Sequence, residues 1–264
     1  MTENKFNIKD TILAVDINEA TQAVKENRFK DAIKLLEINL IEHPDHIDSL
    51  YLAGVCSRYL KEFDDAIKYI ESLLVHAPDM GRAYQELAHI NRDMGNEEKS
   101  ISNYRQACEL NPALISSWMS LYEYFKKNNN KPALNHATEQ INKLKSLPNM
   151  LLYIDQVMNE GRLGVAELKC REFLKKNPTH TYAMSQLSEI ANRLGHFDDA
   201  ELLLEKAVQF NPDDGELRMK YALVLRKKQK FAKTMEQVNI LCDKYPDNLA
   251  YQAQKASEIM QNGQ

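Results

Sequence analysis

The sequence contains no long apolar run. No stretch approaches the roughly 18 uninterrupted apolar residues that a membrane-spanning helix needs, and polar residues dominate the first ten positions, MTENKFNIKD. We therefore expect neither a membrane span nor a secretion signal. The cysteines are few and scattered, without a Cys-x-x-Cys pair: Cys56, Cys108, Cys170 and Cys242. This usage disfavours a disulfide framework or a zinc site, and it fits buried thiols in a reducing cytoplasm.

Motifs of catalysis and cofactor binding are also missing. The sequence has no Gly-x-Ser-x-Gly nucleophile turn, no Gly-x-x-x-x-Gly-Lys-Ser/Thr phosphate loop and no His-Glu-x-x-His metal motif. His43 and His46, in HPDH, could hold a metal together, but a solvated turn is the commoner setting of such a pair. The net charge of −4 gives no case for nucleic-acid binding. We therefore expect no enzyme, no metal and no cofactor in this chain.

What the sequence does have is a period of 34 residues. Six of the eight prolines recur at steps of 34, with a single step of 66: Pro44, Pro78, Pro112, Pro178, Pro212 and Pro246. A fixed step of this size is typical of a stacked repeat array. With proline at position 32 of each period, we predict a polar lead-in (1–12), seven repeats (13–46, 47–80, 81–114, 115–146, 147–180, 181–214 and 215–248) and a terminal segment (249–264).

Each repeat has the pattern of two helices. In its first half, apolar residues at spacings of three and four, as in Trp118, Leu121 and Phe125, predict an amphipathic helix. At position 15 a glycine often offers the left-handed conformation that ends a helix: Gly95, Gly161, Gly195 and Gly263. Phrases such as FDDA, at 63–66 and again at 197–200, then start a second helix. This helix has acids in its first turn, a small alanine at position 20 for close packing, and a proline after its end.

These residues resemble the tetratricopeptide repeat, with alanine at position 20 (Ala32, Ala66, Ala200), proline at position 32 and Trp/Leu/Gly/Tyr positions in the first helix. The resemblance covers residues 13–264. It implies an all-α fold in which antiparallel helix pairs stack into a right-handed α-α superhelix, here of seven pairs plus a terminal helix. It also implies a concave groove, lined mainly by the first helices, that binds a protein or peptide segment.

Two parts of the array depart from the pattern. In repeat 115–146, three asparagines replace the turn glycine, Pro132 fits the first turn of the second helix, and Ala133 takes the small-residue role. This irregularity indicates either a hinge or an old deletion absorbed by a turn. Residues 249–264 are either a natural capping helix or a truncated eighth repeat. The apolar flank of that last helix could also support self-association of the chain.

The groove is the candidate site. In the family that the chain resembles, positions 2, 5, 9, 12 and 13 face the groove, and positions 12 and 13 carry mostly cations in this sequence. Arginine forks there could bind the carboxylates of an acidic peptide, yet the helix dipole favours cations near a helix C-terminus in any case. We expect Tyr59 to stack or to donate a hydrogen bond, and Gln85 and Asn192 to bond a peptide backbone. His89 could contact a ligand, but an exposed neutral histidine is the commoner setting. The candidate groove residues are Arg58, Tyr59, Arg82, Gln85, His89, Arg92, Lys126, Asn192 and Arg193.

Two functions remain open at this point. The first is a cytoplasmic, non-catalytic scaffold for protein–protein interaction. For the second, residues 82–125 resemble the N-terminal arm of bacterial tetratricopeptide-repeat sulfotransferases, whose donor PAPS binds a C-terminal domain. The chain would then be the arm of a larger enzyme, without a PAPS site of its own. The Lys-x-x-x-Asn, Asn and Lys-x-x-x-Arg set with which the family clamps acidic chaperone tails is not found in consecutive first helices.

Overall fold

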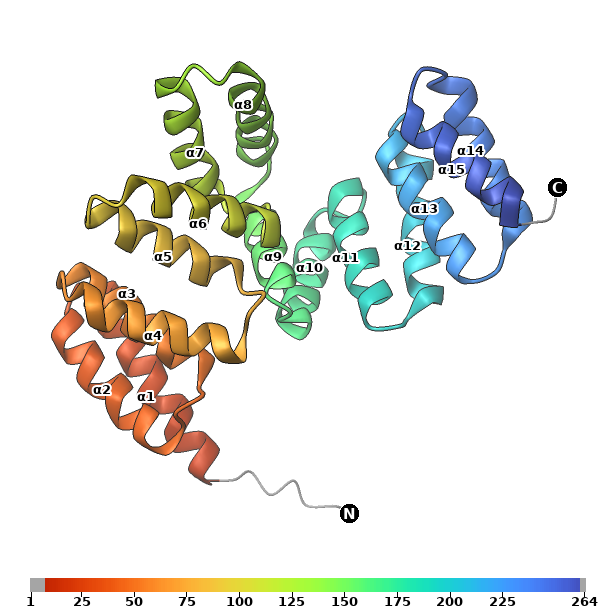
Figure 1. Cartoon of the computed structure of the whole chain (residues 1–264). Helices are drawn as coiled ribbons and strands as arrows, with labels where there is room; N and C mark the ends of the chain where they lie inside the picture. The colour runs from red at the N-terminus through yellow and green to blue at the C-terminus, as the bar shows by residue number, and fades with distance from the viewer. Residues whose placement is uncertain (1–7, 262–264) are drawn as a thin grey trace, which may run out of the picture. The chain divides into compact units, whose positions relative to one another are not determined.

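The computed structural model describes the backbone of residues 8–261 and the side chains of residues 17–261. Within that range the chain forms fifteen α-helices and no strand (Figure 1). This confirms the predicted all-α array of seven helix pairs followed by one further helix. The helices are α1 (Ile8–Lys25), α2 (Phe29–Glu42), α3 (Ile47–Tyr59), α4 (Phe63–His76), α5 (Gly81–Asp93), α6 (Glu97–Leu110), α7 (Ile115–Lys127), α8 (Lys131–Lys145), α9 (Asn149–Asn159), α10 (Leu163–Lys176), α11 (Thr181–Arg193), α12 (Phe197–Phe210), α13 (Gly215–Lys227), α14 (Phe231–Lys244) and α15 (Leu249–Gln261).

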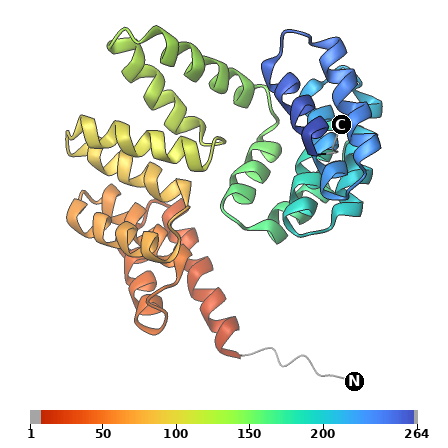
Figure 2. The same ribbon diagram turned by 45° about the vertical axis from the view of Figure 1, so that its right-hand side comes forward.

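The chain divides into two compact units, residues 1–146 and 147–264. Unit 1 contains α1 to α8 and unit 2 contains α9 to α15, and the division falls directly after the second helix of the irregular repeat. Inside each unit, every helix packs against the next one along the chain, so that helix pairs lie side by side (Figures 1 and 2). A single pair cannot cover its own apolar face, and stacking of neighbouring pairs gives each unit its core.

The turn inside every pair has a residue in the left-handed region at position 15. Three of these residues are the predicted glycines Gly95, Gly161 and Gly195, with φ of 82°, 76° and 81°. Gly263 lies outside the described residues. The other four turns use a residue with a side chain: Asn27, Lys61, Asn129 and Gln229, with φ of 59°, 64°, 53° and 58°. The turn geometry is therefore common to all seven pairs, whereas glycine is not.

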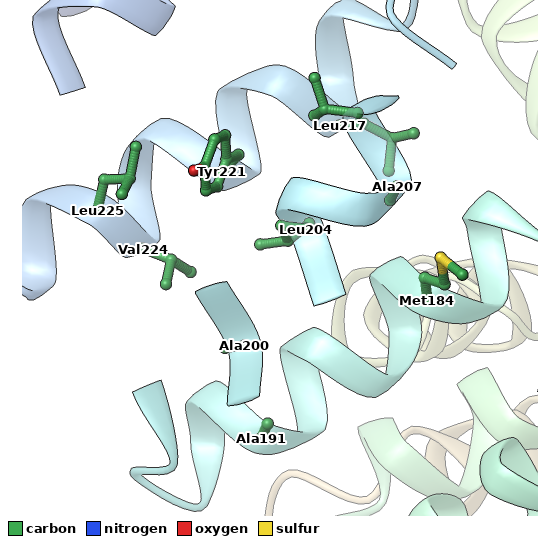
Figure 3. Packing of buried hydrophobic residues seen from close by; sticks show 10 residues of the cluster. Met184, Ala191, Ala200, Leu204, Ala207, Leu217, Tyr221, Val224 and Leu225 are labelled. Carbon is green, nitrogen blue, oxygen red and sulfur yellow. The ribbon is translucent and has the colours of Figure 1, made fainter. Parts of the chain in front are cut away.

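The core of each unit consists of apolar clusters that join helices of neighbouring pairs. Figure 3 shows part of the unit 2 core, where Leu204 of α12 meets Leu217 and Tyr221 of α13 and Met184 of α11. Burying each large apolar side chain of this kind contributes about 1.5–3 kcal/mol. Because each cluster joins three or more successive helices, the repeats stabilise one another.

Small residues at the start of the second helices let the two helices of a pair approach closely. The alanines predicted for this role, such as Ala66 and Ala200, are fully buried. The irregular repeat is an exception to the prediction, because Ala133 is only half-buried and Ala137, one turn later in α8, is fully buried instead. Pro132 does lie in the first turn of α8, as predicted, and the Asn130 side chain caps that helix.

The cysteines behave as small apolar residues. All four are free and buried, which confirms the prediction from their spacing. Burial raises the pKa of Cys56 to about 11 and the pKa of Cys108 to about 12. The thiolate form that reacts with oxidants is therefore scarce at neutral pH.

Candidate functional site

Arg58, at the end of α3, binds acids of the next repeat. Its side chain is 11% exposed, and its Nε forms an ion pair with Oε1 of Glu86 on α5, a side chain that is 4% exposed. Its Nη1 lies 3.4 Å from Oδ2 of Asp93. Burial raises the pKa of Glu86, and the guanidinium of Arg58 opposes that rise. Because Arg58 is already neutralised within the stack, the pairing argues against its predicted role as a partner-binding residue.

Arg92 occupies the same repeat position as Arg58 but has a different setting. Its side chain is 53% exposed, with Nη2 2.9 Å from Oδ1 of Asp93 and Nη1 3.4 Å from Oη of Tyr104. The difference originates in the following repeat, where position 6 is Glu86 for Arg58 but Ser120 for Arg92. Glu86 follows Arg58 by 28 residues, and Arg92 has no acid at that spacing. This spacing was the signal in the sequence that Arg58 is held between repeats and that Arg92 is exposed.

His89 is half-buried on α5 instead of exposed as expected. Its Nδ1 lies 2.7 Å from Oη of Tyr104, and the two rings meet at 72°. Burial, helped by the nearby charges of Arg58 and Arg92, lowers the pKa of His89 to about 4. The histidine is therefore neutral at physiological pH, as expected, but it belongs to the packing between α5 and α6.

Two other candidates in unit 1 link first helices to each other. The Arg82 guanidinium of α5 lies 4.7 Å from the ring centre of Tyr51 on α3. Oε1 of Gln85 accepts a hydrogen bond of 2.9 Å from the Ser117 hydroxyl on α7. Both side chains are half-buried and contribute to the stacking of one pair on the next.

Tyr59 and Lys126 are the remaining candidates in unit 1, and both are exposed. Tyr59 is 54% exposed, and its ring stacks on Phe29 at 4.6 Å while the Arg58 guanidinium lies 4.4 Å from its centre. Nζ of Lys126 lies 5.9 Å from the ring centre of Tyr122. Tyr59, Arg92 and Lys126 are thus the candidates of unit 1 whose side chains are exposed.

Asn192 and Arg193 belong to unit 2, whereas the other seven candidates belong to unit 1. Oδ1 of Asn192 accepts a hydrogen bond of 2.9 Å from Nζ of Lys227 on α13. Arg193 donates to Oε1 of Glu189 at 2.9 Å and to the carbonyl oxygen of Met158 at 3.1 Å. The last contact joins α11 to α9, so Arg193 also ties two repeats together.

Each unit has a pocket between consecutive first helices, with a second helix behind it. The α5–α7 pocket of unit 1 has a volume of about 600 Å³, and the α11–α13 pocket of unit 2 has about 430 Å³. Six repeat positions occur in both: position 12 and position 24 of one repeat, and positions 6, 9, 10 and 13 of the next. In unit 1 these are Arg92, Tyr104, Ser120, Glu123, Tyr124 and Lys127, and in unit 2 they are Asn192, Leu204, Lys220, Leu223, Val224 and Lys227.

Sequence reasoning missed the inner walls of both pockets. Position 24 lies on a second helix, as Tyr104 and Leu204 do, whereas the candidates were sought on first helices only. One signal was present in the sequence, because Leu223 is a large apolar residue at position 9, which faces the groove in this family. Its 41% exposure agrees with that placement.

The described residues offer no alternative site built on a metal. No group of three or more His, Cys, Asp or Glu side chains in residues 17–261 could hold a metal ion. His46 instead caps α3, with its Nδ1 accepting from the backbone N–H of Ser49 at 3.2 Å. Across the helices that the structure describes, none combines the length and the apolar character required for a membrane crossing.

Stacked helix pairs with a shared left-handed turn define a helical repeat protein, and comparison with known families identifies which one. Models of the tetratricopeptide repeat match residues 17–83, 81–114 and 186–248, which together exceed half of the chain. The chain therefore belongs to the tetratricopeptide repeat family. This fold is consistent with a scaffold for protein–protein interaction.

Individual relatives are distant. A DnaJ homolog subfamily C member 7 homolog of Dictyostelium discoideum is 21% identical over 236 residues, which cover 86% of this chain and 39% of that protein. A tetratricopeptide repeat protein from Parabacteroides merdae is 12% identical with a TM-score of 0.44, over 94% of this chain and 98% of the other. A thermophilic repeat protein of Thermus thermophilus is 16% identical with a TM-score of 0.36, over 94% and 99%. The chain thus spans about two fifths of the length of the Dictyostelium relative.

Proposed function

We propose that this chain is a non-catalytic scaffold that binds an extended segment of a partner protein along its first helices. The observation that carries the proposal is the recurrence of one pocket at the same repeat positions in both units. A pocket that recurs with the repeat suits a ligand that is itself a chain, because each pocket can take one side chain of an extended peptide.

Exposure and contacts together divide the nine candidate residues into two groups. Arg58, Arg82, Gln85 and His89 are half-buried between helices, and Arg193 donates to a backbone carbonyl of the preceding repeat, so we assign these five to the stack. Tyr59, Arg92, Lys126 and Asn192 remain as partner-binding residues. Tyr59 offers an aromatic surface, Arg92 and Lys126 offer charge, and Asn192 lines a pocket.

Other parts of the earlier interpretation stay predictions. A cytoplasmic location and self-association through residues 249–264 gain no support from the contacts described above. The same holds for the sulfotransferase arm, and with it for any role of PAPS.

The test is a selection of peptides from a random display library against the whole chain. Selected peptides that bind unit 1 should lose binding at least about tenfold to a variant with Arg92→Glu and Lys126→Glu, because both reverse exposed cations on its first helices. The matched control carries Lys30→Glu and Lys34→Glu, the same charge change on exposed positions of α2. Arg58 is left intact, since its replacement by an acid would disturb the pair with Glu86.

Circular dichroism checks that both variants keep their helical content. Peptides that bind the first-helix variant, the α2 control and a Lys227→Glu variant of the α11–α13 pocket equally well would contradict the proposed face. Failure to select any peptide would contradict the scaffold itself.

A further inference from the structure

The α11–α13 pocket combines an apolar interior with a cationic rim. Leu204 and Val224 form its interior and are 1% and 5% exposed, and Leu223 beside them is 41% exposed (Figure 3 shows the first two). Its volume of about 430 Å³ lies within the range of about 300–1,000 Å³ that is typical of ligand pockets. An aliphatic side chain is the group that such an interior accommodates without an unsatisfied polar atom.

Charges around this pocket are unbalanced. Its lining includes three cations, Lys220, Arg226 and Lys227, and one acid, Glu189. The carboxylate of Glu189 is itself held by Nε of Arg193 at 2.9 Å. An excess of positive charge beside an apolar interior favours a ligand with a carboxylate next to its apolar group.

Lys227 is the cation best placed to receive that carboxylate. Lys220 already has Glu216 at 3.2 Å, and Arg226 has the buried Glu258 at 3.2 Å. Lys227 is exposed, and its ammonium donates to a neutral group, the Asn192 amide oxygen, at 2.9 Å. An ammonium carries three N–H donors, so a ligand carboxylate can be added without displacing Asn192.

The α5–α7 pocket of unit 1 has the same repeat positions but different chemistry. Its Lys127 forms an ion pair of 2.8 Å with Glu97 of the same pocket. Acids and cations are equal there, with Glu97 and Glu123 against Arg92 and Lys127. Tyr104 stands where unit 2 has Leu204. This pocket therefore lacks the charge excess, and its interior combines Ile101 with the rings of Tyr104 and Tyr124 where unit 2 has Leu204 and Val224.

We propose that the α11–α13 pocket selects acidic–aliphatic peptide segments, with an aliphatic side chain against Leu204, Leu223 and Val224 and an adjacent carboxylate on Lys227. This assignment rests on the proposed scaffold function and specifies its ligand class. The α5–α7 pocket then serves as an internal reference, because it shares the geometry and not the chemistry.

Three labelled peptides test the assignment, with binding to the whole chain followed by fluorescence anisotropy. One has the core Asp-Leu-Glu, the second the uncharged core Asn-Leu-Gln, and the third Asp-Ala-Glu, which lacks the aliphatic side chain. The first should bind at least about tenfold tighter than either of the others, since each analogue loses one of the two contacts. Lys227→Gln should remove the preference for the acidic core and leave the preference for leucine over alanine.

Two control variants make the same change elsewhere. Lys127→Gln alters the equivalent position of the α5–α7 pocket, and Lys206→Gln alters an exposed lysine on α12 outside the pocket. Both should retain the full preference for the Asp-Leu-Glu peptide.

Equal affinities for the three peptides would overturn the assignment, as would a loss in Lys127→Gln as large as that in Lys227→Gln. If library peptides still bind the first-helix face in that case, the scaffold stands and only this ligand class is refuted. If the library also yields nothing, both proposals fall.

Discussion

The ion pair between Arg58 and Glu86 makes a sharp prediction about stability. Arg58→Met keeps most of the apolar stem of the side chain and leaves the Glu86 carboxylate, 4% exposed, without its cation. Removing one partner of a buried pair destabilises a protein by about 3–5 kcal/mol, against about 0–1 kcal/mol for an exposed pair. Because Arg58 retains 11% exposure, we expect a loss near the lower end, about 3 kcal/mol.

A double-mutant cycle tests the cause of that loss. Glu86→Leu in the Arg58→Met background removes the stranded charge, so the double variant should recover at least about half of the loss. The assay is urea unfolding followed by Trp118 fluorescence. Trp118 is the only tryptophan of the chain, and it lies half-buried on α7 in the same unit as the pair.

The matched control is Arg171→Met in unit 2. Arg171 and its partner Glu167 on α10 are 55% and 31% exposed, so this change should cost at most about 1 kcal/mol and leave the Trp118 transition unmoved. A loss below about 1 kcal/mol for Arg58→Met would refute the argument, because Arg58 would then behave as a surface charge. A double variant no more stable than Arg58→Met would refute the stranded-charge explanation.

Three further predictions concern pH, turn geometry and thiol reactivity. The pKa of His89 falls from its ordinary 6.5 to about 4 on folding, so the unfolded chain takes up the proton first as the pH drops. About 3 kcal/mol of stability is therefore present above pH 6.5 and lost between pH 6.5 and 4, and His89→Gln should flatten this part of a stability-versus-pH curve. Lys61 and Gly195 both adopt positive φ, which glycine tolerates better than other residues. Lys61→Gly should therefore raise the unfolding free energy of unit 1 by about 1 kcal/mol, and Gly195→Ala should lower that of unit 2 by about 1 kcal/mol. Variants as stable as the unchanged chain in urea would contradict this. In the folded chain, Cys56 and Cys108 should not react with Ellman's reagent at pH 7 until denaturant is added, and rapid labelling would contradict their burial.

The fold could be predicted from the sequence because its determinants repeat. A proline after the second helix and a residue in the left-handed conformation at position 15 recur along the chain. Because these features recur, each repeat confirms the helix boundaries predicted for the others. The residue that fills a given packing position was harder to predict. Ala133 and Ala137 are both small, and only the packing of α8 decides which of them is buried.

The candidate site was less predictable because it depends on neighbours in the next repeat. Arg58 and Arg92 hold the same position, yet Glu86 draws the first into the stack while Ser120 leaves the second exposed. The pocket interior at Leu204 was missed because it comes from a second helix. The position of a residue within its repeat thus indicates on which helix face it lies. The side chains of the following repeat determine whether that residue is exposed and able to bind a partner.

Some cations of this chain form buried ion pairs, and others are exposed. Salt should therefore affect ligand binding and folding stability differently. At 0.15 M salt, exposed charges more than about 8 Å apart are largely screened from one another, whereas buried pairs are screened much less. The Arg58–Glu86 pair is almost closed to solvent, whereas Lys126 and Lys227 are exposed. Adding salt should thus release an acidic ligand long before it loosens the stack. A bound acidic ligand could then be removed with salt while the protein stays folded. The affinity of the protein for that ligand would fall as the salt concentration rises.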